Sequence, residues 1–573
     1  MTKLTGGDVL VKCLIQENVT KVFGVPGDQL YPFLDAIYQS DKIDFVLTRH
    51  EQSAAHAADA WARVTGTPGV CLGTVGPGAA DLVPGVYPAY ADSIPMIVIC
   101  AQNQSWRIHP DHGSTQGLDQ QSLFAAVTKW QVYISHWKRI SMLTQWAFRA
   151  AISGRPAPVL IDVPSDVLYE VGNIEDLEAP ILPPNRYRGI PPVGDREAIK
   201  KAAKMLVEAK LPVIHAGGGV LMSNAAEELV ELAEHLKAPV TTSPRARGVI
   251  PEDHELCFLT AGFGALSVQA EADVVLAIGG KFGDLDFWGK PPAWGESDTQ
   301  KLIQIDIDPI MIGLNRPVDL AIVGDARLTL KRLLKEVKSL QPTKTEDRDI
   351  AEYHAAQEAW LQDFLKAGKS DAKMIHPLRL IQDVRDFFPR DAISVTDGGN
   401  TALWSVYLNR IYQPRTLLWA GDSGHLGTGP GYAIGAKLAR PDTPVYCLTG
   451  DGAFMFNIQE LETMRRLNLP IVIVVANDRA HGMIKAGQKL VYSSRYIGVD
   501  FFDVRYDKIA QAMDCYGERV TEPAEIKAAL KRAVDSGKPA LLDVVIDGSI
   551  NLKPPDFENV AGLWLEGCNL PDE

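Results

Sequence analysis

Residues 445–478, which read VYCLTGDGAFMFNIQELETMRRLNLPIVIVVAND, contain the pattern that most restricts the fold of this chain. Residues 445–449 and 471–476 are continuous apolar runs of strand length, typical of parallel strands that are covered on both faces. Between the runs, apolar residues recur on one helical stripe, and Asn457 stands at the expected N-cap with Glu460 three positions later. The stretch therefore predicts a strand–helix–strand unit with parallel strands.

An acidic residue follows each of these two strands. Asp451 lies in Gly-Asp-Gly and Asp478 ends Asn-Asp. Ligands of open parallel sheets bind beyond the carboxyl ends of the strands, and carboxylate oxygens are the ligands that Mg²⁺ or Ca²⁺ prefer. Gly450 and Gly452 leave room for an anion to approach the backbone. We expect a divalent cation that binds a diphosphate; the alternative is an acidic turn without a ligand.

The order Gly-Asp-Gly, helix, strand, Asn-Asp resembles the thiamine-diphosphate motif. The resemblance implies that the metal ligands are Asp451, Asp478 and the main-chain oxygen of Ala480. It also implies that the cofactor is contacted by the residues around these ligands, namely Gly450, Gly452, Ala453, Gly482 and Met483. The family usually has Asn at position 478, so Asp478 keeps an oxygen ligand and adds a charge.

Three N-terminal segments resemble the pyrimidine-binding domain of acetolactate synthases in order and spacing: FGVPGDQLYPFLDAI, VLTRHEQSAAHAADAWARVTG and GVCLGTVGPGAADLVPGV. The resemblance makes Glu51 the glutamate that hydrogen-bonds ring nitrogen N1′ of the cofactor, and it places Pro26 and Gly27 against the cofactor. Glu51 follows a strand-like run and opens a helical stretch, where the helix dipole alone would also favour an acid. Burial would raise its pKa and make proton sharing with a ring nitrogen feasible.

Two further segments resemble cofactor-binding loops of the same family. VTDGGNTALW matches the loop that meets the diphosphate and nominates Gly399, Asn400 and Thr401. GDSGHLGTGPGYAIGAKLA places Leu426 where relatives carry the bulky apolar side chain that keeps the two cofactor rings folded against each other.

The predicted substrate pocket departs from the best-known relatives near Gln116. This residue, in GSTQGLDQQ, aligns with the glutamine of the Phe-Gln-Glu segment in acetolactate synthases and pyruvate oxidases, while Thr115 and Gly117 replace its neighbours. Because Thr is smaller than Phe, the resemblance implies a roomier pocket. An exposed loop glutamine is the alternative.

A second departure follows the metal pair, in NDRAHGMIKAGQ. Met483 and Ile484 match pocket-lining positions, His481 stands where synthases often carry Gln, and Gly487 replaces a tryptophan that selects the second 2-oxo acid. His481 could exchange a proton near neutral pH, or it could face solvent or bond a carbonyl.

Proline and charge interrupt the periodic pattern at EAPILPPNRYRGIPPVGDRE and QPTKTEDRD. We predict an α/β protein with three doubly wound parallel-sheet domains. These are a pyrimidine-binding domain at 1–178, a central Rossmann-like domain at 195–340, and a diphosphate- and Mg-binding domain at 370–550, followed by a C-terminal tail at 551–573.

The central domain carries weaker nucleotide signals. A Gly-rich turn, Gly217 to Gly219, follows the strand-like run LPVIHA, and Asp306 ends KLIQID. Relatives hold FAD, ADP or nothing in this domain, and flavin-binding acetolactate synthases usually show Arg-Phe-Asp-Asp-Arg where this chain has KFGDLD. The missing arginines argue against FAD, and we favour a structural role for these residues.

Composition limits the partners and the compartment. A formal net charge of -14 argues against nucleic acid and anionic membranes, which reward surplus Lys and Arg. Seven scattered cysteines without CxxC fit a reducing compartment, no apolar run approaches the ~20 residues of a membrane span, and the first residues lack a signal-peptide core. We expect a cytoplasmic protein. The resemblance implies a homodimer or homotetramer, because relatives build each site from two subunits.

Together the segments resemble thiamine-diphosphate-dependent enzymes of the acetolactate synthase, pyruvate oxidase and 2-hydroxyacyl-CoA lyase superfamily. The resemblance implies attack of a thiazolium carbanion on a 2-oxo acid, loss of CO₂ and ligation of the enamine to an acceptor, with Gln116 and His481 holding substrate oxygens. A 2-hydroxyacyl-CoA lyase or oxalyl-CoA decarboxylase remains an alternative, although the tail has one Lys and no Arg for CoA phosphates. A non-catalytic regulatory paralogue would be expected to lose Glu51 or an acidic metal ligand.

Overall fold

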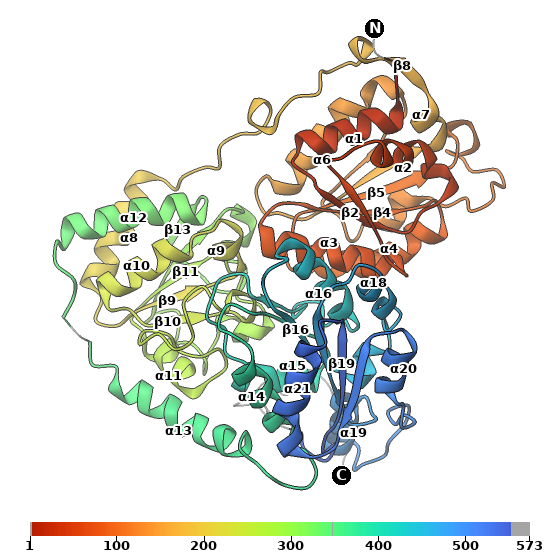
Figure 1. Ribbon diagram of the computed structural model, residues 1–573. Coiled ribbons are helices and arrows are strands. Elements are labelled where there is room, and N and C mark those ends of the chain that lie inside the picture. The colour runs from red at the N-terminus through yellow and green to blue at the C-terminus, as the bar shows by residue number, and fades with distance from the viewer. Residues whose placement is uncertain (1–2, 347, 552–573) are drawn as a thin grey trace. The chain divides into compact units, whose positions relative to one another are not determined.

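The computed structural model describes residues 3–346 and 348–551, and it contains three parallel α/β sheets in succession along the chain (Figure 1). The predicted fold class is therefore confirmed. The predicted tail lies, apart from Asn551, outside the described residues. Across the described ranges, the structure contains no helix that combines the length and the apolar character needed to cross a membrane.

The N-terminal sheet has the order β3-β2-β4-β5-β7-β6, and every pairing in it is parallel. Its strands are β2 (Lys21–Gly24), β3 (Asp44–Leu47), β4 (Gly69–Gly73), β5 (Met96–Gln102), β6 (Trp130–Tyr133) and β7 (Pro158–Pro164). Its helices are α1 (Gly6–Gln16), α2 (Tyr31–Tyr38), α3 (Glu51–Thr65), α4 (Pro77–Ala91), α5 (Gln120–Phe124), α6 (Ile140–Ile152) and α7 (Ser165–Tyr169). The short strands β1 (Lys3–Thr5) and β8 (Val171–Asn173) form a separate antiparallel pair.

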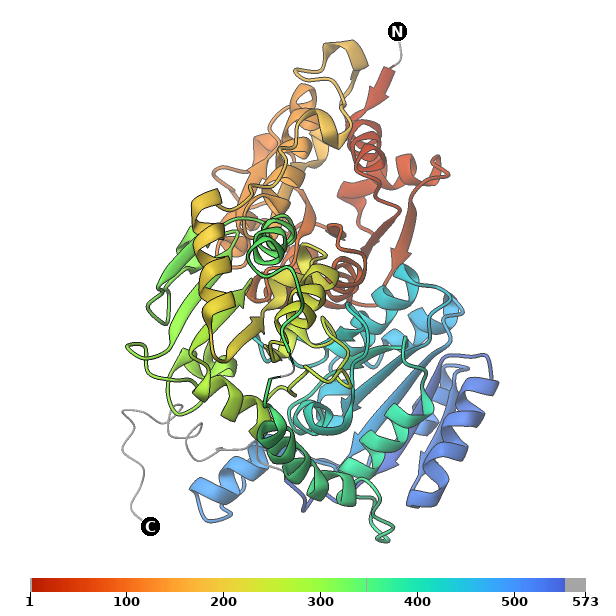
Figure 2. The ribbon, with the colours of Figure 1, turned by 90° about the vertical axis from the view of Figure 1, so that its left-hand side faces the viewer.

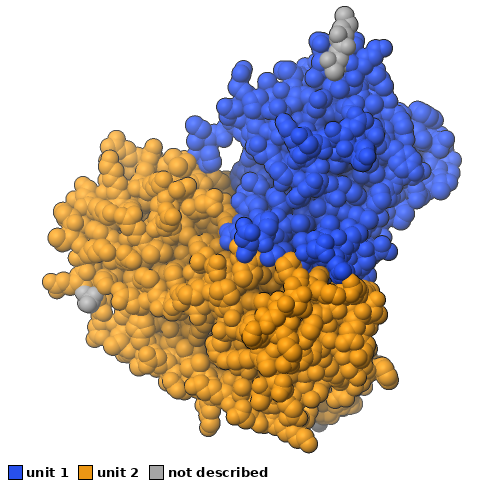
Figure 3. Space-filling model, in the orientation of Figure 1, with its two compact units in different colours: residues 1–191, 420–442, 457–469 blue, residues 192–419, 443–456, 470–573 orange. Residues whose placement is uncertain are grey.

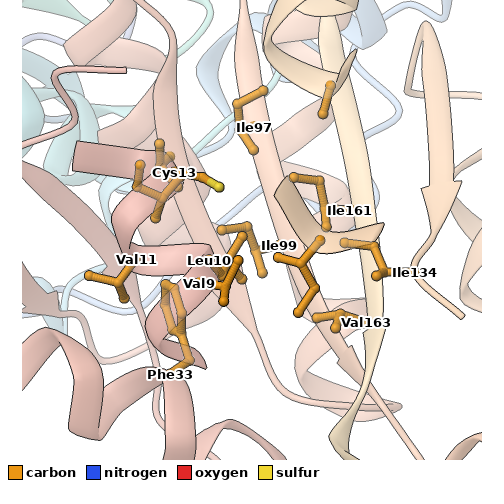
Figure 4. Close-up of a cluster of buried hydrophobic side chains, with 14 of the residues drawn as sticks. Val9, Leu10, Val11, Cys13, Phe33, Ile97, Ile99, Ile134, Ile161 and Val163 are labelled. Atoms are coloured by element: carbon orange, nitrogen blue, oxygen red, sulfur yellow. The ribbon is translucent and has the colours of Figure 1, made fainter. Parts of the chain in front are cut away.

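One face of this sheet is covered by an apolar core (Figure 4). Alternate residues of β5 and β7 point into it, because successive side chains of a strand face opposite sides of the sheet. Among its residues are Val9, Leu10, Phe33, Ile97, Ile99, Ile161 and Val163. The continuous apolar runs of these strands follow from burial on both faces, since α3 and α4 cover the other side.

The central sheet has the order β10-β9-β11-β12-β13. Its strands are β9 (Pro212–Ala216), β10 (Val240–Thr242), β11 (Val274–Ile278), β12 (Lys301–Asp306) and β13 (Leu320–Val323). Its helices are α8 (Arg196–Glu208), α9 (Gly218–Met222), α10 (Ala226–Leu236), α11 (Phe263–Glu271) and α12 (Ala326–Leu340). Leu276 and Ile278 face one apolar core and Val275 and Ala277 face another, so both sides of the sheet are buried.

The C-terminal sheet has the order β15-β14-β16-β17-β19-β18, which repeats the strand order of the N-terminal sheet. Its strands are β14 (Ile393–Thr396), β15 (Leu417–Leu418), β16 (Val445–Gly450), β17 (Ile471–Asn477), β18 (Tyr516–Val520) and β19 (Ala540–Val545). Its helices are α14 (Pro377–Phe387), α15 (Asn400–Leu408), α16 (Thr428–Ala439), α17 (Asp451–Phe454), α18 (Glu460–Arg466), α19 (Gly482–Val491), α20 (Tyr506–Ala512) and α21 (Ile526–Asp535).

The described chain packs as two compact units (Figure 3). Unit 1 comprises residues 1–191, 420–442 and 457–469, and in this unit α16 packs against α3 while α18 packs against α16 (Figure 1). Unit 2 comprises residues 192–419, 443–456 and 470–573. These units are defined by packing and differ from the three sheets, and the predicted domain limits remain predictions.

Within unit 2, the helix α13 (Ala351–Ala367) joins the central and C-terminal parts (Figure 2). It packs against α11 of the central part and against α14 and α15 of the C-terminal part. Phe364 of α13 stacks on Tyr407 of α15, with ring centroids 4.3 Å apart. Unit 2 is therefore continuous through this helix.

One local expectation is wrong. Asn457 does not cap the helix of the strand–helix–strand unit, because α18 begins at Glu460 with Gln459 as its N-cap, and a separate short helix, α17, precedes it. The fully buried Asn457 amide accepts a hydrogen bond from Ser53 Oγ and donates one to Gly427 O instead. Long-range partners thus replaced the local capping bond.

Candidate functional site

In unit 2, the predicted cofactor residues gather at the carboxyl ends of neighbouring parallel strands. Gly399 and Asn400 follow β14, Asp451 follows β16, and Asp478 follows β17. The strand order reverses between β14 and β16, which is where ligands bind in doubly wound sheets. The fold therefore brings these residues to its expected binding crevice.

Asp451 and Asp478 form a buried acidic pair. Asp451 is 2% exposed, and its carboxyl lies close enough to that of Asp478 for the two groups to interact. Burial and the charge of Asp478 raise the pKa of Asp451, and burial raises the pKa of Asp478 as well. Two carboxyl oxygens held together in a buried crevice are the donor set that a hard divalent cation needs.

The described residues contain no cluster of three His, Cys, Asp or Glu side chains suited to a metal ion. The backbone of Ala480 lowers the pKa of Asp478, so the chain lies close to the acidic pair at this point. A main-chain oxygen, as predicted for Ala480, would therefore supply any third protein ligand. The fit of a divalent cation rests on the acidic pair.

Glycines give the acidic pair its space. A Cβ atom at Gly482 would lie 2.4 Å from Asp478 Oδ2 and 2.9 Å from Asn400 Nδ2, and a Cβ at Gly399 would lie 2.9 Å from Met483 Cβ. No side chain fits at either position without displacing a predicted cofactor residue. The loops after β14 and β17 thus meet around Asp478.

Two helices begin at this crevice. α15 starts at Asn400 with Gly399 as its N-cap, and α19 starts at Gly482 with His481 as its N-cap. Helix N-termini present unpaired N–H groups and a partial positive charge, which together favour phosphate oxygens. The crevice therefore fits a diphosphate bound through a cation.

Three further predicted residues of unit 2, Thr401, His481 and Ala453, lie at the Gly-Asp-Gly turn that carries Asp451. A Cβ at Gly450 would lie 3.3 Å from Thr401 Oγ1, and a Cβ at Gly452 would lie 2.8 Å from His481 Nδ1, so Thr401 and His481 border the Gly-Asp-Gly turn. The His481 ring packs against Phe501, with centroids 4.6 Å apart. Ala453 is buried in the same turn.

Two predicted pocket residues of α19 are not packed against the crevice. Ile484 is 57% exposed, and a Cβ at Gly487 would meet no atom within 4 Å among the described residues. Met483 is 38% exposed and lies nearer to the crevice than Ile484 and Gly487, because its side chain contacts Gly399. The pocket roles of all three remain predictions.

In unit 1, Glu51 lies at the carboxyl end of the N-terminal sheet. It begins α3 and is 9% exposed. A Cβ at Gly78, in the first turn of α4, would lie 3.1 Å from Glu51 Oε1. Burial raises the pKa of Glu51, and the nearby Asp81 raises it further. The Glu51 carboxyl is thus buried with a raised pKa, and its cofactor role stays a prediction.

The loops after β2 and β4 meet beside Glu51, at the point where this sheet reverses its strand order. The exposed Pro26 precedes Gly27, and a Cβ at Gly27 would lie 2.1 Å from Thr74 Oγ1. Thr74 donates its hydroxyl proton to Gln29 Oε1 at 2.7 Å. The N-terminal and C-terminal sheets therefore carry their predicted cofactor residues at equivalent edges.

Gln116 lies in an exposed loop but is firmly placed. Its φ is +62°, and a Cβ at Gly76 would lie 2.4 Å from its carbonyl oxygen. Thr115 is also exposed, and its carbonyl accepts a bond from Asn103 Nδ2 at 3.0 Å. Glycine at position 76, with φ +66°, is required for this close approach.

A buried polar network beneath this loop was not predicted. Gln120 Oε1 accepts the Gly76 N–H at 3.0 Å, and Gln120 Nε2 donates to Asp162 Oδ1 at 2.7 Å. Asp162 is fully buried in β7, and burial raises its pKa to about 7. An Asp inside the apolar run PVLIDVP is the sequence signal that points to it.

Leu426 lies in unit 1, close to the helix that begins with Glu51. The neighbouring His425 Nε2 is 3.0 Å from Gln52 Nε2, and the α16 glycines that follow pack tightly on α3. A Cβ at Gly435 would lie 2.2 Å from Ala57 O, which explains the small residues at this crossing. Leu426 itself is half-exposed.

In the central sheet, contacts give the Gly-rich turn a structural role. Gly217 N–H bonds Ile278 O and Gly219 N–H bonds Gly279 O, at 2.8 and 3.0 Å. A Cβ at Gly217 would lie 2.2 Å from Gly279 O, so the two loops at this switch point are in backbone contact. Asp306 accepts the N–H of Asp308 at 2.9 Å. Whether this domain holds FAD, ADP or neither stays a prediction.

Comparison with known proteins agrees with this geometry. Residues 4–123 match the family described as thiamine pyrophosphate enzyme, N-terminal TPP binding domain. Residues 199–333 match the central domain of these enzymes, and residues 397–544 match their C-terminal TPP binding domain. The class of protein is thus a thiamine pyrophosphate enzyme.

Relatives with printed names cover nearly the whole chain. The "Probable acetolactate synthase large subunit" of Methanocaldococcus jannaschii is 38% identical over 569 residues, which are 95% of this chain and 92% of that protein. The protein of the same name from Methanococcus aeolicus is 37% identical, over 96% of this chain and 94% of its own. Acetolactate synthase isozyme 3 large subunit of Escherichia coli is 31% identical over 99% of each chain.

The chain therefore belongs to the thiamine-pyrophosphate-dependent enzymes of the acetolactate synthase and pyruvate oxidase superfamily. The family membership predicted from the sequence motifs is confirmed, and so is the prediction of an enzyme.

Proposed function

We propose that this enzyme uses thiamine diphosphate and Mg²⁺ to decarboxylate a 2-oxo acid and to ligate the remaining unit to an acceptor. One C–C bond breaks and releases CO₂, and one C–C bond forms to the acceptor carbonyl carbon, whose oxygen takes up a proton. The acetolactate synthase names of the relatives support this reaction class. The buried acidic pair of Asp451 and Asp478 at two helix N-termini is the observation that carries the proposal.

The bound cofactor would supply a carbon nucleophile and an electron sink, which are the parts of this chemistry that no side chain provides. Asp451, Asp478 and the main-chain oxygen of Ala480 would hold the cation. Asn400 and the N–H groups at the start of α19 would face the diphosphate. The protein's contribution here is position and charge.

Glu51 would hold and return a proton at ring nitrogen N1′ of the cofactor. Its carboxyl is largely shielded from water, and burial raises its pKa, which favours proton sharing with a ring nitrogen. Leu426 would support the cofactor from the turn beside Glu51. Because Glu51 would act on the cofactor and not on the substrate, its loss should affect turnover more than substrate binding.

Gln116 and His481 would orient the substrate oxygens. Gln116 is held by its contact with Gly76, and His481 by its packing against Gly452 and Phe501. We also propose a cytoplasmic homodimer or homotetramer, as the resemblance implies. Sedimentation should then show no active monomer.

The test is reconstitution with thiamine diphosphate and Mg²⁺, followed by a screen of 2-oxo acids, singly and in pairs, for CO₂ and ligated products. We expect CO₂ release that depends on both additions, with ligated product from at least one pair. Cleavage of 2-hydroxyacyl-CoAs without any 2-oxo acid turnover would replace this proposal by the lyase alternative. Turnover that is unchanged without the cofactor would contradict both.

A further inference from the structure

The turn that carries Glu51 is bonded on both sides of this residue by one short segment. We define the Glu51 turn as residues 47–53 and the clasp as residues 457–466, which includes α18 (Figure 1). Both lie in unit 1. The bonds join Arg466 Nη2 to Leu47 O at 2.7 Å, Arg49 N to Glu460 Oε1 at 3.0 Å, and Ser53 Oγ to Asn457 Oδ1 at 2.9 Å.

Glu460 is the central contact of the clasp. Its carboxyl is fully buried, and both of its oxygens lie within hydrogen-bond distance of the Arg49 N–H, at 3.0 and 3.3 Å. Thr463 Oγ1 donates a further bond at 2.6 Å. Burying a carboxyl is costly unless its oxygens are paired, so these bonds fix Glu460 and the backbone just before Glu51 together.

Asn457 extends the clasp to the turn that carries Leu426. It is fully buried, it accepts the Ser53 hydroxyl, and its amide donates to Gly427 O at 2.7 Å. Gly427, with φ +82°, directly follows Leu426 and caps α16. One side chain thus spans the two segments of unit 1 that are proposed to contact the cofactor rings.

We infer that the clasp positions Glu51 through the buried side chains of Glu460 and Asn457. Neither residue is proposed to touch substrate or cofactor, so both are positioning residues. The inference rests on the proposed function of Glu51. Proton exchange at a ring nitrogen is sensitive to sub-ångström placement of the carboxyl, so a looser turn should slow turnover before it weakens substrate binding.

The test uses the full-length protein with Glu460→Gln. The amide keeps the size of the side chain but replaces one accepting oxygen by a donor that faces another donor. We expect hydrogen exchange of the 47–53 backbone to rise by about tenfold or more, because the bond from the Arg49 N–H to the buried carboxyl is weakened or lost. With thiamine diphosphate and Mg²⁺ bound, kcat for the best 2-oxo acid should fall by about tenfold while KM stays within about twofold.

Arg465→Gln is the matched control. Arg465 lies on the same helix, is half-exposed, and donates to Asn468 Oδ1 at 2.7 Å without touching a clasp bond named above. The exchange of the Glu51 turn and kcat should both stay near those of the unchanged protein. If Glu460→Gln does not fold, Ser53→Ala removes a single clasp bond and should shift exchange and kcat in the same direction by about threefold.

Two results would overturn the inference. Faster exchange of the Glu51 turn with unchanged kcat would show a purely structural contact, and unchanged exchange would show that the clasp does not hold the turn. Failure of the proposed function is distinguishable, because a Glu51→Gln enzyme with undiminished turnover would remove the role of Glu51 while leaving the exchange result intact.

Discussion

Replacing Asp162 by Asn should abolish a pH dependence of stability that is built into unit 1. Asp162 is fully buried, and burial raises its pKa to about 7 in the folded protein. The pKa of Asp162 in the folded protein is higher than the ordinary Asp value of about 3.9. The folded protein therefore binds more protons than the unfolded chain between about pH 4 and about pH 7. The stabilising contribution of the protonated Asp162 carboxyl is therefore fully present below about pH 4 and is lost as pH rises through about 7.

The size of the effect follows from the two pKa values. An ordinary Asp pKa of about 3.9 and a folded-state pKa of about 7 correspond to about 4 kcal/mol, of which about 3 kcal/mol is lost between about pH 5 and about pH 8. The asparagine side chain is uncharged at every pH and can still accept the bond from Gln120 Nε2. The variant should thus gain about 3 kcal/mol relative to the unchanged protein over this interval.

The assay is native-state hydrogen exchange of the β7 amides, which reports the free energy of opening without assuming that this large chain unfolds in two states. Asp119→Asn is the control: the Ser122 hydroxyl and amide lower the pKa of Asp119, so its contribution is lost only as pH falls through that lowered pKa. A difference between Asp162→Asn and the unchanged protein that stays constant with pH would refute the reasoning.

Three further predictions follow from the site. Asp478→Ala should weaken Mg²⁺ binding by about tenfold or more, measured by calorimetry on the cofactor-free protein, because one of the two side-chain oxygen ligands is lost; equal affinity would contradict the metal assignment. Gly27→Val should weaken thiamine diphosphate binding in fluorescence titrations, because its Cβ would lie 2.1 Å from Thr74 Oγ1; unchanged binding would show that this loop does not meet the cofactor. Gln120→Glu should raise KM for the 2-oxo acid, since its carboxyl faces Asp162 and no longer donates; an unchanged KM would separate this network from the pocket.

The strands and their carboxyl ends could be predicted from sequence because their causes are local. Parallel strands buried on both faces need continuous apolar runs, and the runs at β16 and β17 end within one residue of the predicted limits. Glu51 was likewise expected to open a helix, and α3 begins there. Family resemblance then supplied roles that periodicity alone does not contain.

Long-range polar contacts could not be predicted in this way. Asn457 has the amide that an N-cap needs, but the same amide bonds Ser53 and Gly427, and no local pattern shows which set of partners prevails. Asp162 is an acid within an apolar run, but that pattern does not show that its partner is Gln120, 42 residues earlier in the chain. These residues take their partners from the fold, which the sequence pattern does not place in space.

The central claim is that the Glu51 carboxyl activates a bound thiamine cofactor. The most direct measurement is the rate of hydrogen–deuterium exchange at the thiazolium C2 atom of enzyme-bound thiamine diphosphate, followed by NMR after acid quench, in the unchanged protein and in Glu51→Gln. We predict exchange much faster than in the free cofactor, and a fall of about a hundredfold or more in the variant. An exchange rate that Glu51→Gln leaves unchanged would contradict the account.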